Sequence, residues 1–176
     1  MIFRYSMAII LGALMSIGAS GQAADEYKVK AAFLYNFPKF VEWPAQAFKS
    51  PADPIVIGVL GRNPFHEALS DALAGKNING RRFEIREISE ASQAAGCQMI
   101  FFAASERKRN AELLKEIGMM GILTIGETAN FAEDGGVVNF KIEGGNVRLQ
   151  INLDAARRQQ LHISAKLLSL AEIVGK

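Results

Sequence analysis

Three short, almost uncharged apolar segments constrain the fold of this 176-residue chain more than any other feature. They are residues 55–61, 98–104 and 121–127. A continuous apolar run of this length is typical of a strand buried on both faces, as in a parallel sheet covered by helices. Segments with helical periodicity lie between and around these runs. The alternation predicts an α/β fold, a single domain with a mostly parallel, twisted sheet and flanking helices.

Weaker patterns predict the remaining secondary structure. Residues 81–89 roughly alternate apolar and polar side chains, which is typical of an edge or half-buried strand. Two strands around a glycine-rich turn at 143–146 predict a C-terminal antiparallel hairpin. Helices are expected at 25–43, 63–76, 105–118, 154–161 and 164–174, with Asn63, Ser105, Asp154 and Ser164 as N-caps of the last four.

The N-terminus has the composition of an export signal. Arg4 precedes an uncharged apolar stretch, Met7 to Ala19, and small residues follow in Ser20–Ala24. This arrangement predicts a signal peptide at residues 1–24, cleaved after Ala23 or Ala24, and a mature exported domain at residues 25–176. A retained membrane anchor is the alternative, although the apolar stretch is short for a bilayer span.

The sequence offers little material for catalysis. His66 and His162 are the only histidines and Cys97 the only cysteine, and none has the spacing of a zinc site. Twenty basic residues nearly balance eighteen acidic ones, so no nucleic-acid partner is indicated. We therefore expect no enzyme, no metal and no cofactor. A hydrolase that pairs His66 or His162 with a carboxylate is the weakest of three functional hypotheses.

The stretch AAFLYNFPKFVEWP, Ala31 to Pro44, is the best candidate for a partner surface. Phe33 and Phe37 share one helical stripe and are expected in the core. Pro38 lacks the N–H that a helix would use, which predicts a kink or an early helix end there. Core packing and a protein interface fit the remaining candidates equally well, and these are Tyr35, Pro38, Phe40 and Trp43.

A small-ligand sensor is the second hypothesis. Open α/β sheets bind ligands beyond the carboxyl ends of their strands. Two of the buried runs end there in polar residues. The expected ligand-site residues are Gly61, Arg62, Asn63, Glu127 and Thr128.

Several blocks together resemble one family. EYKVKAAFLYNFPKFVEWP, IVIGVLGRNPF, GCQMIFF and the segment from GILTIGE to the C-terminus resemble the YfiR family of small periplasmic proteins. This resemblance implies a non-enzymatic regulator that represses an inner-membrane diguanylate cyclase by binding its periplasmic domain. Repression would lower cyclic-di-GMP signalling and biofilm formation.

The resemblance also implies further partners. An OmpA-like outer-membrane lipoprotein would sequester the repressor, and family members form homodimers. One departure concerns cysteine, because better-studied members carry cysteine pairs. Cys97 matches a family cysteine position but has no partner in this chain, so we expect no redox control.

Overall fold

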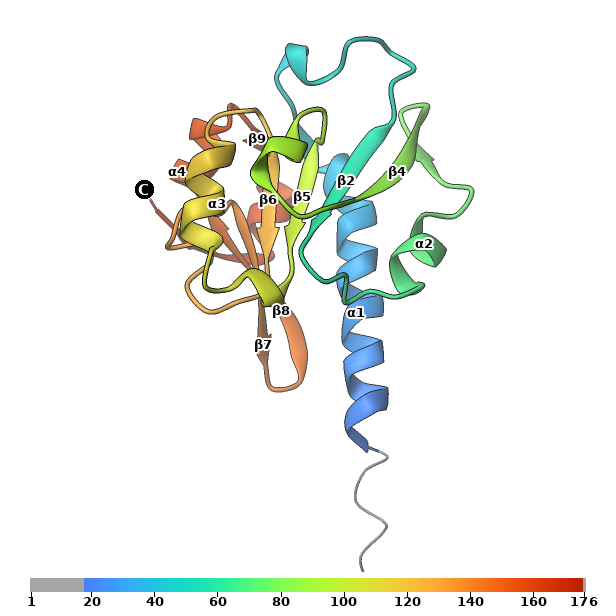
Figure 1. The fold of residues 1–176 in the computed structure, drawn as a ribbon, viewed down its shortest axis with the longest axis vertical. Coiled ribbons are helices and arrows are strands. Elements are labelled where there is room, and N and C mark those ends of the chain that lie inside the picture. Colours follow the sequence, from blue (N-terminus) through green and yellow to red (C-terminus); the bar gives the residue numbers. More distant parts are fainter. Residues whose placement is uncertain (1–17, 176) are drawn as a thin grey trace, which may run out of the picture.

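A computed structural model describes residues 18–175 and centres them on one mixed sheet (Figure 1). Its strand order is β10-β8-β7-β6-β5-β2-β4-β3. The strands are β2 (Ile55–Leu60), β3 (Asn77–Ile78), β4 (Arg81–Ile88), β5 (Met99–Phe102), β6 (Leu123–Gly126), β7 (Val138–Glu143), β8 (Asn146–Asn152) and β10 (Ala171–Val174). The three buried runs became the central strands β2, β5 and β6.

Five neighbouring strands of the sheet run parallel, in the order β4, β2, β5, β6 and β7. If these five are numbered by their order along the chain, their order across the sheet is 2-1-3-4-5. This is one of the common doubly wound orders. The antiparallel hairpin of β7 and β8 extends the sheet on one side, and β3 pairs antiparallel with β4 on the other. The predicted single α/β domain with a C-terminal antiparallel pair is confirmed.

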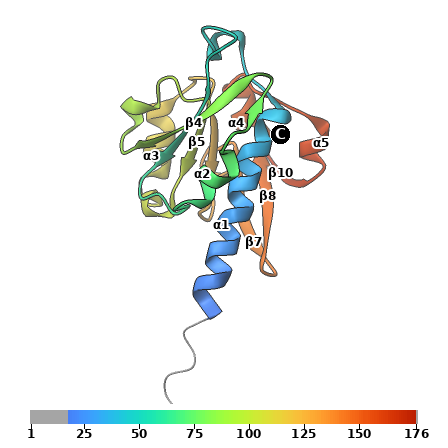
Figure 2. The same cartoon turned by 90° about the vertical axis from the view of Figure 1, so that its right-hand side faces the viewer.

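Helices cover both faces of the sheet (Figure 2). The first face is packed by α1 (Gly18–Asn36), α2 (Ala68–Leu73), α4 (Leu153–Arg158) and α5 (Ala165–Leu168). The second face is packed by α3 (Asn110–Ile117) and the 3-10 helix η3 (Ala91–Ala94). Side chains alternate along β2, so that Ile57 and Val59 face the first layer while Val56 and Leu60 face the second.

The first helix ends earlier than the predicted residue 43. Its last residue is Asn36, and Pro38 lies in the short 3-10 helix η1 (Phe37–Lys39). The early end expected from Pro38 is therefore observed. Phe37 is buried as predicted, whereas Phe33 is only half-buried. Leu34 is fully buried, because the helix presents Ala31 and Leu34 to the sheet.

Two of the predicted helix starts are wrong. The segment after β2 does not become helical until Ala68, because His66 adopts a positive φ of 50°. Asn63 instead forms a local turn, in which its Oδ1 accepts a hydrogen bond from the Phe65 N–H at 3.0 Å. Ser105 lies in the 3-10 helix η4 (Ala104–Glu106), and α3 begins only at Asn110.

Two N-caps were predicted in the C-terminal region of the chain, and the structure bears out one of them. Asn152, not Asp154, caps α4, because its Oδ1 accepts from the Ala155 N–H at 2.9 Å. Ser164 caps α5 as predicted, with its hydroxyl facing the Leu167 N–H.

The predicted helix at 164–174 is wrong in its second half. Helix α5 ends at Leu168, and residues 171–174 form β10, which pairs parallel with β8. Backbone groups along the outer edge of β8 thereby gain partners, and Ile173 lies beside Ile151. Sheet completion outweighs the helical preference of this short segment.

A second, two-stranded sheet joins distant parts of the chain. Its strands are β1 (Val41–Glu42) and β9 (His162–Ile163), which pair antiparallel. Next to this pair, the Ser164 N–H donates to the Phe40 carbonyl at 2.8 Å. The segment after η1, which includes η2 (Ala45–Ala47), is thus fixed against the C-terminal region.

Most of the predicted signal peptide lies outside the described residues. Its final part, residues 18–24, forms the first turns of α1, so that the predicted cleavage position falls inside this helix. Residues 21–25 are exposed. Within residues 18–175, no helix has both the length and the apolar character needed to cross a membrane.

Candidate functional site

The candidate site lies at the carboxyl ends of β5 and β6, beneath α1. Strand β6 ends at Gly126, where a Cβ atom would come within 2.2 Å of the buried Phe131 ring. A second glycine, Gly136, meets the same ring from the other side of the turn, at 2.1 Å. Only glycines allow this turn to fold over Phe131, and the turn brings Glu127 and Thr128 to the edge of the sheet.

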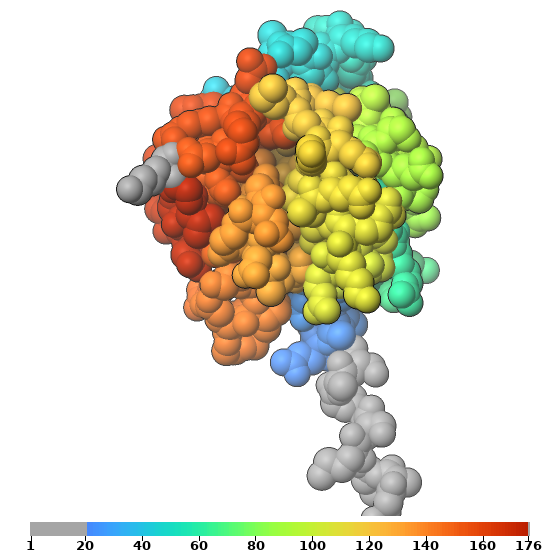
Figure 3. Space-filling view, turned by 60° about the vertical axis from the view of Figure 1, so that its left-hand side comes forward, coloured from blue at the N-terminus to red at the C-terminus, as the bar shows by residue number. Residues whose placement is uncertain are grey.

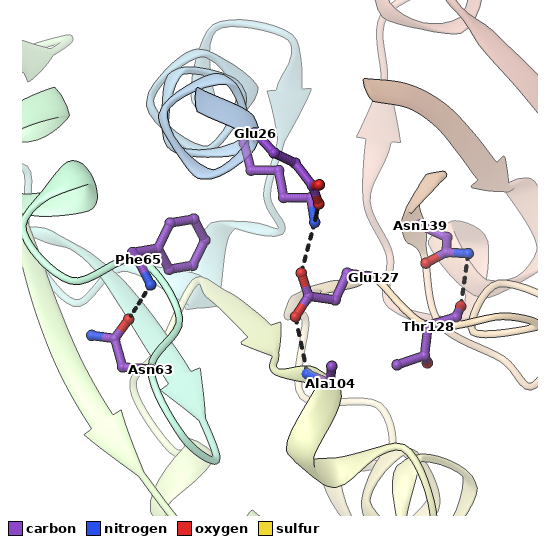
Figure 4. Close-up of polar contacts among 8 residues, drawn as sticks. Glu26, Asn63, Phe65, Ala104, Glu127, Thr128 and Asn139 are labelled. Carbon is purple, nitrogen blue, oxygen red and sulfur yellow. Dashed lines mark hydrogen bonds and ion pairs between the residues drawn. The ribbon is translucent and has the colours of Figure 1, made fainter. Parts of the chain in front are cut away.

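Glu127 forms a buried ion pair with Lys30 of α1. The Lys30 ammonium lies 2.7 Å from Glu127 Oε2, and both side chains are 3% exposed. A second carboxylate, that of Glu26 one helical turn earlier, also contacts the Lys30 ammonium. The other Glu127 oxygen accepts from the Ala104 N–H at 3.0 Å (Figure 4). This pair therefore joins α1, β6 and η4 at one point.

Tyr27 completes the polar cluster. Its ring centroid is 4.6 Å from the Lys30 ammonium, a cation–π distance. Burial, together with the charge and hydrogen bond of Glu127, raises the pKa of Tyr27 well above its ordinary value. The hydroxyl therefore stays protonated and donates to Glu127. Lys30, two carboxylates and one phenol form a connected network.

Two buried amides flank Thr128. Asn110 Nδ2 donates to the Thr128 hydroxyl at 2.8 Å, and Asn139 Nδ2 donates to the Thr128 carbonyl at 3.0 Å. Both residues are buried, yet the Oδ1 atoms of Asn110 and Asn139 have no hydrogen-bond partner among the described residues. Buried acceptors are nearly always satisfied in folded proteins, so these two oxygens are unusual.

A cavity of about 460 Å³ opens between α1 and these groups. Its walls come from α1, the segment after β5, the segment after β6, and β7. The lining residues are Glu26, Tyr27, Lys30, Ala104, Glu127, Thr128, Ala129, Asn139, Phe140, Lys141 and Ile142.

The sequence-predicted ligand residues fall into two groups. Glu127 and Thr128 line the cavity, whereas Gly61, Arg62 and Asn63 do not. The Arg62 N–H instead donates to Ser105 Oγ at 3.0 Å, beyond the carboxyl ends of the neighbouring strands β2 and β5. The side chain of Asn63 donates to Glu87 at 3.1 Å. In Figure 4, Asn63 lies well to one side of Glu127.

Sequence reasoning missed the α1 side of this site, which is Glu26, Tyr27 and Lys30. One local signal existed, since Glu26 and Lys30 have the i, i+4 spacing of a helical ion pair. Nothing local indicated that Lys30 would be buried against Glu127, 97 residues later.

The predicted partner residues occupy a different part of the first face. Tyr35 is half-buried beside Phe83, with the ammonium groups of Lys39 and Lys76 at 4.4 and 4.6 Å from its ring centroid. Phe40 is half-buried with Lys166 at 5.7 Å.

The other two predicted partner residues are held by the fold itself. The Trp43 indole donates to the Gln98 carbonyl at 3.0 Å, and Pro38 is buried. Of the four predicted partner residues, Tyr35, Phe40 and Trp43 are therefore the ones whose side chains remain partly exposed.

A second hollow lies between the N-terminal half of α1 and the β7–β8 hairpin. Its volume is about 690 Å³, and its apolar residues include Val29, Phe33, Ile142 and Val147. Val29 is 44% exposed and Ile142 is 49% exposed, which is high for aliphatic side chains. Figure 3 shows the start of α1 emerging beside the hairpin. Sequence reasoning did not identify this surface.

No catalytic arrangement forms around the histidines or the cysteine. His66 and His162 are exposed, and no group of metal-ligating side chains lies together within the described chain. Cys97 is buried, and this burial raises the pKa of its thiol. Arg86 Nη1 lies 3.8 Å from the sulfur, and its charge opposes this shift only in part.

Two solved structures share this fold at low sequence identity. One is a conserved domain protein from Vibrio cholerae O1 biovar El Tor, with 12% identity and a TM-score of 0.58 over 84% of this chain. The other is an ABC domain in complex with L-Trp from Streptococcus pneumoniae, with 11% identity and a TM-score of 0.54 over 87% of this chain. The matches span only 59% and 60% of those two chains. No curated protein matches the sequence.

The doubly wound sheet and its covering helices define a single domain of the α/β class. The family follows from the sequence itself. Residues 27–172 match the YfiR/HmsC-like family, and the chain belongs to that family. Its members are periplasmic regulators of cyclic-di-GMP signalling.

Proposed function

We propose that this protein is a non-enzymatic periplasmic repressor, which binds the periplasmic domain of an inner-membrane diguanylate cyclase. The match to the YfiR/HmsC-like family over nearly the whole domain carries the proposal. Repression lowers cyclic-di-GMP and disfavours biofilm formation. An OmpA-like outer-membrane lipoprotein that captures the repressor would release the cyclase, and a homodimer of the repressor is part of the same proposal.

A regulator that catalyses no reaction must act by binding one conformational state of its target more tightly than another. A complete switch needs a difference of about 5.5 kcal/mol between the two states. A few aromatic or arginine anchors usually supply most of such energy. Tyr35, Phe40 and Trp43 are available on one part of the surface, and Val29 with Ile142 on another.

The test is a binding measurement with the purified periplasmic domains of the inner-membrane diguanylate cyclases of the organism that encodes this chain. We expect Tyr35→Ala and Phe40→Ala each to weaken binding about tenfold or more, as hot-spot truncations do. Glu112→Ala is the control, because Glu112 is exposed on α3, which packs against the other face of the sheet. Circular dichroism establishes that each variant is folded. If the folded wild-type chain shows no binding at about 10 µM, the repressor mechanism is wrong.

A small-ligand sensor is the second candidate function. The specific observation in its favour is the cavity under α1, with Glu127 and Thr128 in its lining. The ABC domain that shares this fold was solved in complex with a small molecule, L-Trp. A folded chain that binds small molecules but no cyclase domain would favour this candidate.

A further inference from the structure

Two consecutive methionines lie on the surface of the domain. Met119 and Met120 occupy the turn between α3 and β6, and they are 78% and 51% exposed. Neither is among the buried or half-buried side chains that form the two hydrophobic clusters. Tight turns usually carry glycine, proline or small polar residues, so two thioethers in water are unusual there. Packing of the core therefore does not account for this methionine pair.

The turn that carries the methionine pair is held at both ends. Gly118 and Gly121 flank the pair with φ values of 58° and 72°, a conformation that glycine adopts without steric cost. The buried Gln159 side chain spans the turn. Its Oε1 accepts from the N–H groups of Gly121 and Ile122 at 2.9 and 3.1 Å, and its Nε2 donates to the Gly118 carbonyl. The two thioethers are therefore exposed in the native fold itself, without any local unfolding.

The other sulfur atoms of the described chain are shielded from solvent. Met99 lies in β5 and is 0% exposed. Cys97 is 4% exposed, and burial raises the pKa of its thiol, which disfavours the reactive thiolate. The remaining methionines lie outside the described residues and are Met1, Met7 and Met15. Within residues 18–175, the methionine pair therefore holds the sulfur atoms that a dissolved oxidant reaches first.

From this arrangement we propose that Met119 and Met120 form a reversible oxidation site, at which a peroxide converts each thioether to methionine sulfoxide. The sulfur lone pair attacks one peroxide oxygen, so that an S–O bond forms and the O–O bond breaks. The sulfur loses two electrons, and the departing hydroxide takes the proton from the new S–OH group and leaves as water. The polar sulfoxides point into solvent and can be reduced again by methionine sulfoxide reductases. This modification does not depend on the cyclase partner.

The experiment treats the purified chain with hydrogen peroxide, stops samples with catalase and follows tryptic peptides by mass spectrometry. Cleavage after lysine and arginine places the methionine pair in peptide 116–141, and Met99 with Cys97 in peptide 87–107. In the folded chain we expect the pair to gain oxygen at least about tenfold faster than Met99, and in concentrated urea at a similar rate. Equal rates in the folded chain overturn the proposal, and so does a loss of the Cys97 thiol that precedes oxidation of the pair.

Two variants locate the reaction. Met119→Leu/Met120→Leu keeps apolar side chains of similar volume but removes both thioethers, so peptide 116–141 should gain no oxygen. Met99→Leu is the matched control, and the methionine pair should be oxidised in it at the wild-type rate. Oxygen uptake by peptide 116–141 in the double variant shows that another group of this segment reacts, and overturns the assignment.

Reversal and stability complete the test. Methionine sulfoxide reductases A and B act on opposite sulfoxide epimers, and together they should return peptide 116–141 of the folded chain to its reduced mass. The doubly oxidised chain should unfold at the same urea concentration as the reduced chain, because both side chains lie outside the hydrophobic clusters. A lowered unfolding midpoint, or repair that requires the unfolded chain, overturns the proposal of a reversible site on the native surface.

Discussion

The two faces of the sheet differ in what they bury. The α3 face encloses an apolar cluster in which Phe102 and Phe131 pack at 5.0 Å between ring centroids. The α1 face encloses a larger apolar cluster and, at its edge, the Lys30–Glu127 pair. The charged side chains of this pair are each only 3% exposed. The α3 face is thus a closely packed apolar layer, whereas the α1 face contains the Lys30–Glu127 ion pair and the cavity at which binding is proposed.

The largest expected effect tests the rigidity of the α3 face. Phe131→Ala should lower the free energy of unfolding by about 4 kcal/mol, because it empties the space that Gly126 and Gly136 leave for the ring. Urea denaturation followed by circular dichroism measures the loss. Phe48→Ala, at a half-buried ring on the other face, is the control and should cost less. A loss below about 1 kcal/mol for Phe131→Ala would show that this cluster is loosely packed.

The next effect tests the charge on the α1 face. Lys30→Met should cost about 3 kcal/mol at pH 7, because it leaves the Glu127 carboxylate buried without its cation. The double variant Lys30→Met/Glu127→Leu should regain most of that stability, since it removes both charges. Chemical denaturation of the two single variants and the double variant gives the coupling energy. Additive losses would mean that the pair is not a coupled unit.

A smaller effect is expected from Cys97 on the α3 face. Cys97→Ser should cost about 1 kcal/mol and leave partner binding unchanged, because the sulfur acts as a small buried group. Burial raises the pKa of the thiol, so iodoacetamide should modify the folded protein far more slowly than the unfolded protein at pH 8. Rapid modification of the native chain, or loss of partner binding in the folded variant, would contradict this view.

The smallest effect concerns an exposed contact between β7 and β10, in which the Lys141 ammonium lies 2.8 Å from the Glu172 carboxylate. This contact holds the pKa of Glu172 below its ordinary value of 4.5. The carboxylate therefore adds a small stability above pH 4.5, and this contribution disappears as the pH falls through the lowered pKa. Glu172→Gln should reduce stability slightly at pH 7 and not at pH 3. A constant difference between the two proteins from pH 3 to pH 7 would exclude an ionic contribution.

Strands buried on both faces were predictable from sequence because their pattern is local. Ile55–Leu60 needs no distant information to read as a strand inside an α/β sheet. Helix starts were less predictable, since Asn63 and Asp154 have suitable side chains but the backbone begins its helices elsewhere. The helix predicted at the C-terminal end of the chain was wrong for another reason. Residues 171–174 take their conformation from the open edge of β8, which no local pattern reveals.

Sequence reasoning identified the part of the candidate site that follows β6 but not the part contributed by α1. The rule that ligands lie at the carboxyl ends of strands pointed to Glu127 and Thr128, which do line the cavity. It also pointed to Gly61, where the Ser105 hydroxyl and Glu106 occupy the space. The contribution of α1 depends on how that helix packs across the sheet, and Lys30 gives no local sign of its burial.

The Lys30–Glu127 contact also sets an order of events in time. The two residues are 97 positions apart, so at roughly 5–20 residues per second Lys30 is synthesised on the order of 5–20 s before its partner. During that interval Leu34 and Phe37, which end up buried against the sheet, have no complete sheet to cover. The first helix therefore cannot complete its packing until β6 and β7 have been made.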